Sequence, residues 1–254
     1  MKILMLLLGM SSLPVFGAVQ LKGTTIDAKS GAKLFDQVID LDQGKMRIEI
    51  TGKGKHQALI YRLDQKVIWV ADFKNNTLVE LTEDDLKRMK SRIDMAKKLV
   101  EQNMAAMPKK LQEQMKKSMQ AYDGKSTPVT FKVVEKNVKV GTFTCKKLEG
   151  RVKGEKKSDI WSADYSSLGV KDKEFEVLSQ FEGLAGNFVE QNFGSLGKEA
   201  NLGFQKMSGF PVRVWMYRDG KLSQKSELSS VSTVASLASK FERPKDLQVK
   251  KIPF

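Results

Sequence analysis

Between residues 18 and 81, hydrophobic and polar residues alternate in short runs that are separated by turn residues. In KMRIEIT, Met46, Ile48 and Ile50 alternate with polar side chains, which is typical of a strand with one buried face. The runs HQALIYRL, KVIWVADF and NTLVELT follow, and residues suited to hairpin turns stand between them at 64–65 and 74–76. The pattern predicts an antiparallel meander.

From residue 82 the hydrophobic period changes from two to steps of three and four, which predicts a helix. Thr82 is a suitable N-cap, and three acidic residues follow it in the first turn. We expect Pro108 to kink or restart this helical insertion, which extends over about 82–122. Its apolar positions form one stripe: Leu86, Met89, Ile93, Ala96, Val100, Met104, Met107, Leu111, Met115, Met119 and Tyr122.

Strand-like runs resume at residue 129, with VTFKVVEK, VKVGTFTCKKLEG and KSDIWSAD. A second helical stretch is predicted over about 172–193, weakened by Gly183 and Gly186. A hairpin that turns at Asp219 and Gly220 leads into a serine- and threonine-rich strand. We therefore predict an α+β fold, in which helices cover one face of a large antiparallel sheet in a single domain over 18–254.

The first residues, MKILMLLLGMSSLPVFG, have the layout of a secretory signal peptide over residues 1–17. The alternative, a transmembrane anchor, needs about 20 apolar residues, and this run is shorter. The only cysteine, Cys145, lies far from the cleavage site, so no lipid anchor is expected. No later segment is long and apolar enough to be a transmembrane helix. The sequence predicts a soluble exported protein of the periplasm.

A formal net charge of +14 indicates an anionic partner or a solvated basic surface. After export, nucleic acid is not an expected partner. Anionic lipid head groups, an anionic membrane surface or acidic envelope polymers are the natural counter-charges. The alternative, that the lysines form a solvated coat without a particular partner, stays open.

Little in the sequence indicates catalysis or a resident cofactor. One cysteine excludes an internal disulfide, and a buried small hydrophobe is the simplest interpretation of Cys145. His56, the only histidine, lies in the polar stretch GKGKHQ, so no metal site is predicted. Ser195 stands between glycines without the hydrolase spacing. Acid pairs from distant strands stay possible, but we expect no enzyme activity and no cofactor.

Two groups of apolar residues are candidates for binding a ligand. Methionine fills cores, and it also suits surfaces that accept varied apolar partners. Lysine pairs at 97–98, 109–110 and 116–117 accompany the stripe, so an apolar groove with a basic rim would suit an amphiphile with an anionic head. Core packing and helix docking on a membrane would give a similar pattern. The candidates are Met104, Met107, Met115 and Met119 on the helix, as a lid, and Trp69, Trp161 and Trp215 on the sheet, as walls.

Several motifs resemble the outer-membrane lipoprotein carrier (LolA-like) superfamily. LDQKVIWVADFKNNTLVEL is similar to its strand pair, in which a turn, Lys66 and Trp69 precede a second turn, and GKMRIEI with Arg47 is similar to the preceding strand. KFERPKDLQVKK resembles its C-terminal strand ending. Closer still is an exported bacterial domain-of-unknown-function family of that superfamily, on KMRIEI, VGTFTCKKLEG, DIWSAD and the long charged helix. The likeness covers about 44–244.

The resemblance implies a curved antiparallel half-barrel whose concave face is covered by helices, with an apolar cavity between them. In the carrier branch this cavity takes up lipoprotein acyl chains, and Arg47 is implied to tether the lid or an anionic head group. The longer helical insertion and the cysteine strand depart from that branch. We expect a periplasmic binding or carrier protein for a lipid or an acylated protein. The alternative is an envelope structural or sensing module that binds another protein.

Overall fold

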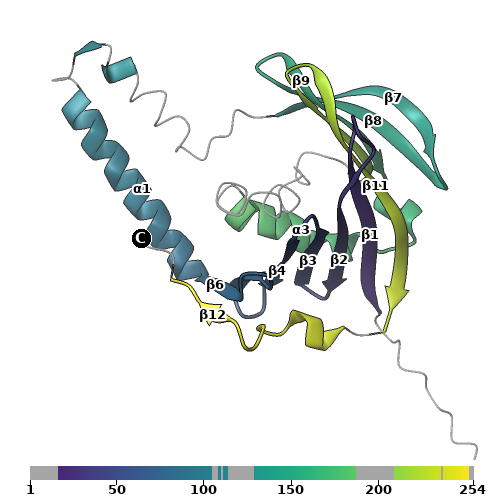
Figure 1. Ribbon diagram of the computed structural model, residues 1–254, viewed down its shortest axis with the longest axis horizontal. Helices are drawn as coiled ribbons and strands as arrows, with labels where there is room; N and C mark the ends of the chain where they lie inside the picture. The colour runs from purple at the N-terminus through teal and green to yellow at the C-terminus, as the bar shows by residue number, and fades with distance from the viewer. Residues whose placement is uncertain are drawn as a thin grey trace, which may run out of the picture.

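Twelve strands form one sheet in the computed structural model of this chain (Figure 1). The structure describes residues 17–104, 108–109, 111–113, 129–186, 209–235 and 237–251. The first half of the sheet consists of β1 (Ala18–Asp27), β2 (Lys33–Asp42), β3 (Lys45–Gly52), β4 (Lys55–Arg62), β5 (Val67–Asp72) and β6 (Thr77–Thr82). The second half consists of β7 (Thr130–Val140), β8 (Phe143–Val152), β9 (Glu155–Ala163), β10 (Phe210–Arg218) and β11 (Lys221–Val234), and β12 (Gln248–Val249) is the last strand.

The order of the strands joins the beginning of the described chain to its later part. It runs β12-β6-β5-β4-β3-β2-β1-β11-β10-β9-β8-β7, so β1 connects the two halves by pairing with both β2 and β11. Every pair is antiparallel except β12 with β6. The sheet is therefore open, with β7 and β12 at its edges. The prediction of a mostly antiparallel α+β fold is confirmed.

Predicted turns match the hairpins of the structure. At the β10–β11 turn, Asp219 has φ 50° and Gly220 has φ 71°, which suits the type I′ turn that Asp-Gly sequences favour. The β4–β5 and β5–β6 hairpins also turn where the sequence predicts, between Arg62 and Val67 and between Asp72 and Thr77. Two-residue hairpin turns that match the right-handed twist of the strands need positive φ at their central residues, as Asp219 and Gly220 have.

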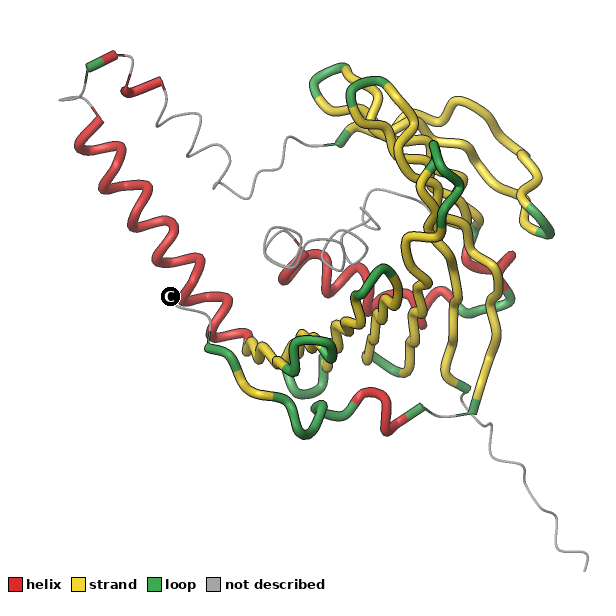
Figure 2. Tube along the Cα trace, viewed as in Figure 1, coloured by secondary structure: helices red, strands yellow, loops and turns green. Residues whose placement is uncertain are grey.

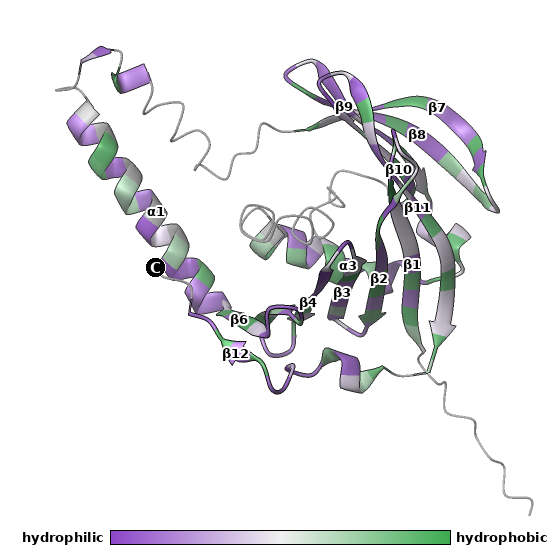
Figure 3. Ribbon diagram, viewed as in Figure 1, coloured by the Kyte–Doolittle hydropathy of each residue, from purple (hydrophilic) through white to green (hydrophobic). Residues whose placement is uncertain are grey.

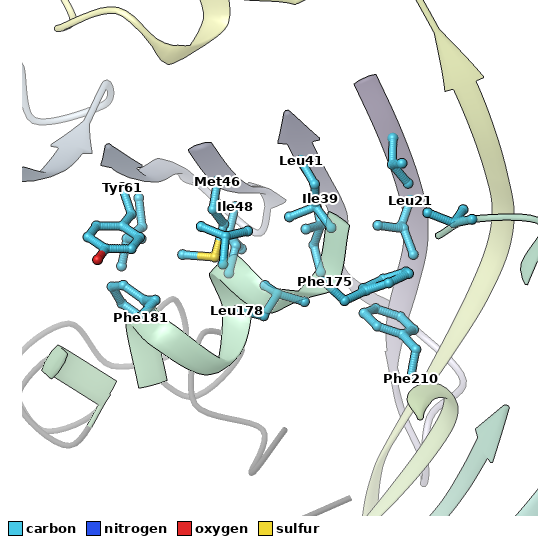
Figure 4. Close-up of a cluster of buried hydrophobic side chains, with 14 of the residues drawn as sticks. Leu21, Ile39, Leu41, Met46, Ile48, Tyr61, Phe175, Leu178, Phe181 and Phe210 are labelled. Atoms are coloured by element: carbon cyan, nitrogen blue, oxygen red, sulfur yellow. The ribbon is translucent and has the colours of Figure 1, made fainter. Parts of the chain in front are cut away.

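The main core lies between the sheet and one short helix, α3 (Asp172–Phe181). Phe175, Leu178 and Phe181 are at most 1% exposed and point from α3 toward the strands (Figure 4). The ring of Phe181 lies 5.5 Å from that of Tyr61, and Phe175 lies 5.5 Å from Phe210. Full burial of such a side chain stabilises the fold by about 1.5–3 kcal/mol.

Helix α3 ends where the sequence predicts weakness. A π-helical turn, η2 (Glu182–Gly186), replaces the α-helix at the segment that contains Gly183 and Gly186. A 3-10 turn, η1 (Tyr165–Leu168), precedes α3, and the ring of Tyr165 stacks on Phe175 at 4.3 Å. The rest of the predicted stretch, up to residue 193, lies outside the described residues.

The long helix α1 (Glu83–Met104) begins at the end of β6 and leads away from the sheet (Figures 1 and 2). Thr82 and Asp85 form a reciprocal cap: the Thr82 backbone N–H donates to Asp85 Oδ2 at 2.9 Å, and the Asp85 N–H donates to Thr82 Oγ1 at 3.1 Å. Pro108 restarts the helical backbone, since the N–H groups of Leu111 and Gln112 donate to its carbonyl oxygen.

The prediction that this helix lies along the sheet is wrong beyond its first turns. Leu86 and Met89 pack against the main core, whereas Met95 and Leu99 are 66% and 60% exposed. Hydrophilic residues predominate along α1 (Figure 3). The physical reason is that α3 already covers the sheet, with Phe175, Leu178 and Phe181 filling the space a second helix would need.

A C-terminal segment crosses the other side of β3 to β6, a feature not recognised in the sequence as a cover. It contains the 3-10 turn η4 (Ala238–Phe241), and Phe241 is fully buried against Ile60 and Trp69. The buried Arg62 donates to the Phe241 carbonyl oxygen at 3.3 Å and pairs with Glu242 at 3.1 Å. The sheet is thus covered on both faces in its first half.

Candidate functional site

A groove of about 630 Å³ lies across the strands where the two halves of the sheet meet. Residues of β1, β2, β9, β10 and β11 line it. Phe131 of β7 also lines it, although β7 is five places from β1 in the strand order, because the sheet bends between these strands (Figure 1). Its volume lies within the range of about 300–1,000 Å³ that is usual for small-ligand sites.

One end of the groove, its inner end, is apolar and adjoins the main core. Leu21, Phe35, Ile39 and Phe210 line this end and also belong to the buried core cluster. They are at most 7% exposed. A ligand that reaches this end contacts mainly hydrocarbon and aromatic groups, with the Gln37 amide between Phe35 and Ile39.

The floor follows from the register of the strands. Cross-strand pairing puts Thr25 opposite Ser226, Ser226 opposite Val214, and Val214 opposite Ile160. These residues therefore form one row on the same face of the sheet, and Ser226, Val214 and Ile160 of this row line the groove. The hydroxyl groups of Thr25 and Ser226 share a hydrogen bond of 2.8 Å, so the polar atoms in this row are paired.

The far wall depends on a glycine. Phe131 lies opposite Gly150 in the β7–β8 pair, and Gly150 lies opposite Ser158 in the β8–β9 pair. A Cβ atom at Gly150 would collide with the Ser158 hydroxyl and would lie 3.1 Å from the edge of the Phe131 ring. The missing side chain lets Phe131 lie over the strand and form a wall of the groove.

The other end, the outer end, is polar and cationic. It lies at the hairpin side of β9, β10 and β11, and its lining includes Lys157, Ser158, Gln224 and Arg218. Lys157 Nζ pairs with Glu155 at 2.7 Å, and the Glu155 side chain is 74% exposed. The groove therefore changes from apolar to cationic along the direction of its strands.

The predicted residues Arg47 and Trp69 do not line this groove. Trp69 belongs to the cluster around Phe241, and its indole N–H donates to Glu80 at 2.8 Å. Arg47 pairs with Glu49 at 2.9 Å and donates to the Lys240 carbonyl oxygen. Both side chains thus help to hold the C-terminal segment, on the other side of the sheet from α3.

Trp161 and Trp215 lie beside the groove strands but outside its lining. They follow Ile160 and Val214 directly, so strand alternation turns them to the opposite face. Their rings meet edge to face at 4.9 Å, and Lys147 Nζ lies 4.9 Å from the centre of the Trp161 ring. They pack on each other and on cations, and the groove walls come from smaller neighbours.

The predicted methionine lid lies largely outside the described residues. Met107, Met115 and Met119 belong to the segments that the structure leaves undescribed, and only the backbone of Met104 is described, at the end of α1. Their role as a lid stays a prediction.

Cys145 is the buried small hydrophobe that the sequence predicts. It is 2% exposed in β8, and burial raises the pKa of its thiol. His56 lies in β4, where its Nε2 is 2.6 Å from Glu49 Oε1. Within the described ranges, no three His, Cys, Asp or Glu side chains gather in a way that could hold a metal ion. Within the same ranges, no helix has the length and apolar character needed to cross a bilayer.

Comparisons with known proteins leave the family open. No family model and no curated protein matches the chain. An uncharacterized conserved protein of Thermus thermophilus is similar in structure, with 10% identity, a TM-score of 0.44, and 93% of this chain and 91% of that chain covered. A LolA superfamily protein of Nitrosomonas europaea has 8% identity, a TM-score of 0.28, and coverage of 91% and 92%. Likenesses at these scores establish neither family nor function.

Proposed function

We propose that this protein binds an amphipathic ligand, a lipid or the acyl chain of an acylated molecule, in the groove between β1, β2 and β9 to β11. The observation that carries the proposal is the groove's polarity. Its inner end is apolar at Leu21, Ile39 and Phe210, and its outer end is polar at Lys157 and Arg218. An amphiphile has the same division between chain and head.

The energy of burial is sufficient for non-covalent binding. Each methylene that leaves water contributes about 0.8 kcal/mol, so ten buried methylenes contribute about 8 kcal/mol. Part of this offsets the cost of immobilising the ligand, which is several kcal/mol. The balance suits a carrier that must also release its ligand.

Export is part of the proposal, and the leader-like layout of residues 1–17 supports it. β1 begins at Ala18, which is fully buried, directly after the leader predicted over 1–17. The leader, apart from Gly17, lies outside the described residues. In this proposal the bent sheet acts as a half-barrel that carries its ligand through the periplasm.

Lipid analysis of the purified protein tests the function. The protein is isolated from cells without detergent, extracted with organic solvent, and the extract is examined by mass spectrometry. We expect acyl-containing molecules at up to about one equivalent, and uptake of dodecanol by protein that has been stripped of lipid. Absence of acyl species, together with no uptake of dodecanol or dodecanoate, would contradict the proposal.

A further inference from the structure

The outer end of the groove holds a cation that has no ionic partner among the described residues. Arg218 ends β10 and lines the groove, on the same side as Val214 and Met216. That position follows from strand alternation, since residues 214, 216 and 218 project to one face. No acidic side chain in the described part of the chain pairs with its guanidinium.

A second cation reaches the same end through an irregularity of the sheet. The register of β8 and β9 shifts next to Gly150, so that Arg151 pairs with Lys156 and Gly150 pairs with Ser158, leaving Lys157 between them. Lys157 lines the groove, whereas Lys156 turns to the other face and pairs with Asp159 at 2.8 Å. Regular alternation would turn Lys157 away from the face that Ser158 occupies, and the bulge is the reason that both residues line the groove.

The local charge balance at this end favours an anion. Among the described residues, Lys157 pairs with the exposed Glu155, and an exposed ion pair is weak and easily exchanged. The acidic residue in the groove lining, Glu227, is already paired with Arg213 at 2.8 Å. Neutral hydrogen-bonding groups, Ser158 and Gln224, also line the outer end, with the side chain of Met216 between them.

We propose that Arg218 and Lys157 form a head-group subsite for a ligand with an anionic oxygen head, a carboxylate or a phosphate. This inference rests on the proposed function and adds the chemical class and the orientation of the ligand. The head lies at the hairpin end, and the acyl chain extends toward Phe210. A guanidinium binds either head through two parallel hydrogen bonds, and a lysine adds a third charged donor.

Three probes with the same chain length separate the contribution of the head group to binding from that of the chain: dodecanoate, dodecyl phosphate and dodecanol. Their affinities are measured by titration calorimetry on delipidated wild-type protein, Arg218→Gln and Lys157→Gln. Lys136→Gln is the matched control, because Lys136 is an exposed lysine of β7 that does not line the groove. Far-ultraviolet circular dichroism verifies that each variant is folded.

We expect at least one anion to bind about tenfold or more tightly than dodecanol, as for hydrogen bonds to charged groups. Arg218→Gln should reduce the ratio of the affinity for the anion to the affinity for dodecanol by about tenfold, and Lys157→Gln should reduce this ratio less. Dodecanol itself should bind all variants equally. The preferred head, carboxylate or phosphate, identifies which anion the subsite takes. Added salt should weaken binding of the anion only.

The two proposals fail in different ways. If dodecanol binds as tightly as both anions, or if Arg218→Gln and Lys136→Gln have the same effect, the head-group subsite is wrong and the groove still binds chains. If none of the three probes binds the wild-type protein, the proposed function fails, and the subsite fails with it.

Discussion

Replacing Ser226 by phenylalanine should close the groove while leaving the sheet intact. Ser226 lies in the floor row, is half-buried, and is bonded to Thr25 at 2.8 Å. A phenylalanine at this position projects into the groove, because the side chain of residue 226 lines the groove. Serine to alanine at the same position removes the hydrogen bond and leaves the space open, so it is the matched control.

The two variants should lose similar amounts of stability for the same reason. Thr25 is 1% exposed, so its hydroxyl loses its partner and stays away from water. An unsatisfied buried group of this kind costs about 1–3 kcal/mol. We expect the free energy of unfolding, measured in urea, to fall by about 1–3 kcal/mol in both Ser226→Ala and Ser226→Phe. The groove accommodates the added ring of the phenylalanine.

Binding should separate the two variants. A phenylalanine that takes over about 150 Å² of apolar groove surface removes about 4 kcal/mol of ligand burial at 25 cal/mol per Å². This corresponds to a loss of several hundredfold in the affinity for dodecanol. Titration calorimetry measures it, with Ser226→Ala expected to bind within a fewfold of wild type. Equal binding by folded Ser226→Phe would mean that the ligand does not occupy this groove.

Further predictions concern the elements around the groove. Thr82→Ala should destabilise the protein by about 1 kcal/mol in urea unfolding because the reciprocal cap with Asp85 is lost, and Thr82→Ser should restore it; equal losses in both variants would contradict the cap. Phe175→Ala should cost about 3–5 kcal/mol because its ring is 1% exposed between α3 and the sheet; a cost below about 1 kcal/mol would mean that α3 does not cover the sheet. The Arg243 guanidinium, followed by the Trp69 indole, holds the pKa of Glu80 below its ordinary value of 4.5. A carboxyl with a lowered folded pKa stabilises the fold above the unfolded pKa and loses that contribution as the pH falls through the lowered value. Wild type should therefore lose more stability than Arg243→Gln between about pH 5 and pH 3, and parallel losses would contradict this ion pair.

Local features of the fold could be predicted from the sequence because their signals are local. Alternation in KMRIEIT predicts a strand whose Met46, Ile48 and Ile50 are fully buried, and the structure has this strand as β3. Asp219 and Gly220 make their turn because few other residues accept positive φ at two consecutive positions. The burial of Cys145 follows from the same alternation.

Long-range features could not be predicted, because spacing along the chain does not determine which strands meet. Nothing local indicates that β1 pairs with β11, yet this pairing creates the groove. The choice between α1 and α3 as the cover depends on which helix reaches the sheet, and both have an apolar stripe. A bulge beside Gly150 brings Lys157 to the same face as Ser158, and a one-residue shift leaves no reliable sequence signal.

The candidate site shows the same limit at single residues. Tryptophan is a reasonable choice for an apolar wall, but Trp161 faces away from the groove and its neighbour Ile160 faces it. Side-chain size indicates burial, whereas strand register decides the face. Arg218 lies at the outer end of the groove and has no ionic partner among the described residues, but no sequence motif marks it.

The most direct measurement of the central claim is the affinity of the delipidated protein for a series of carboxylates from octanoate to tetradecanoate. If the chain is buried in the groove, each methylene adds about 0.8 kcal/mol, or about fourfold in Kd, until the groove is filled, and Ser226→Phe loses this dependence. An affinity that does not change with chain length in the wild-type protein would contradict the account.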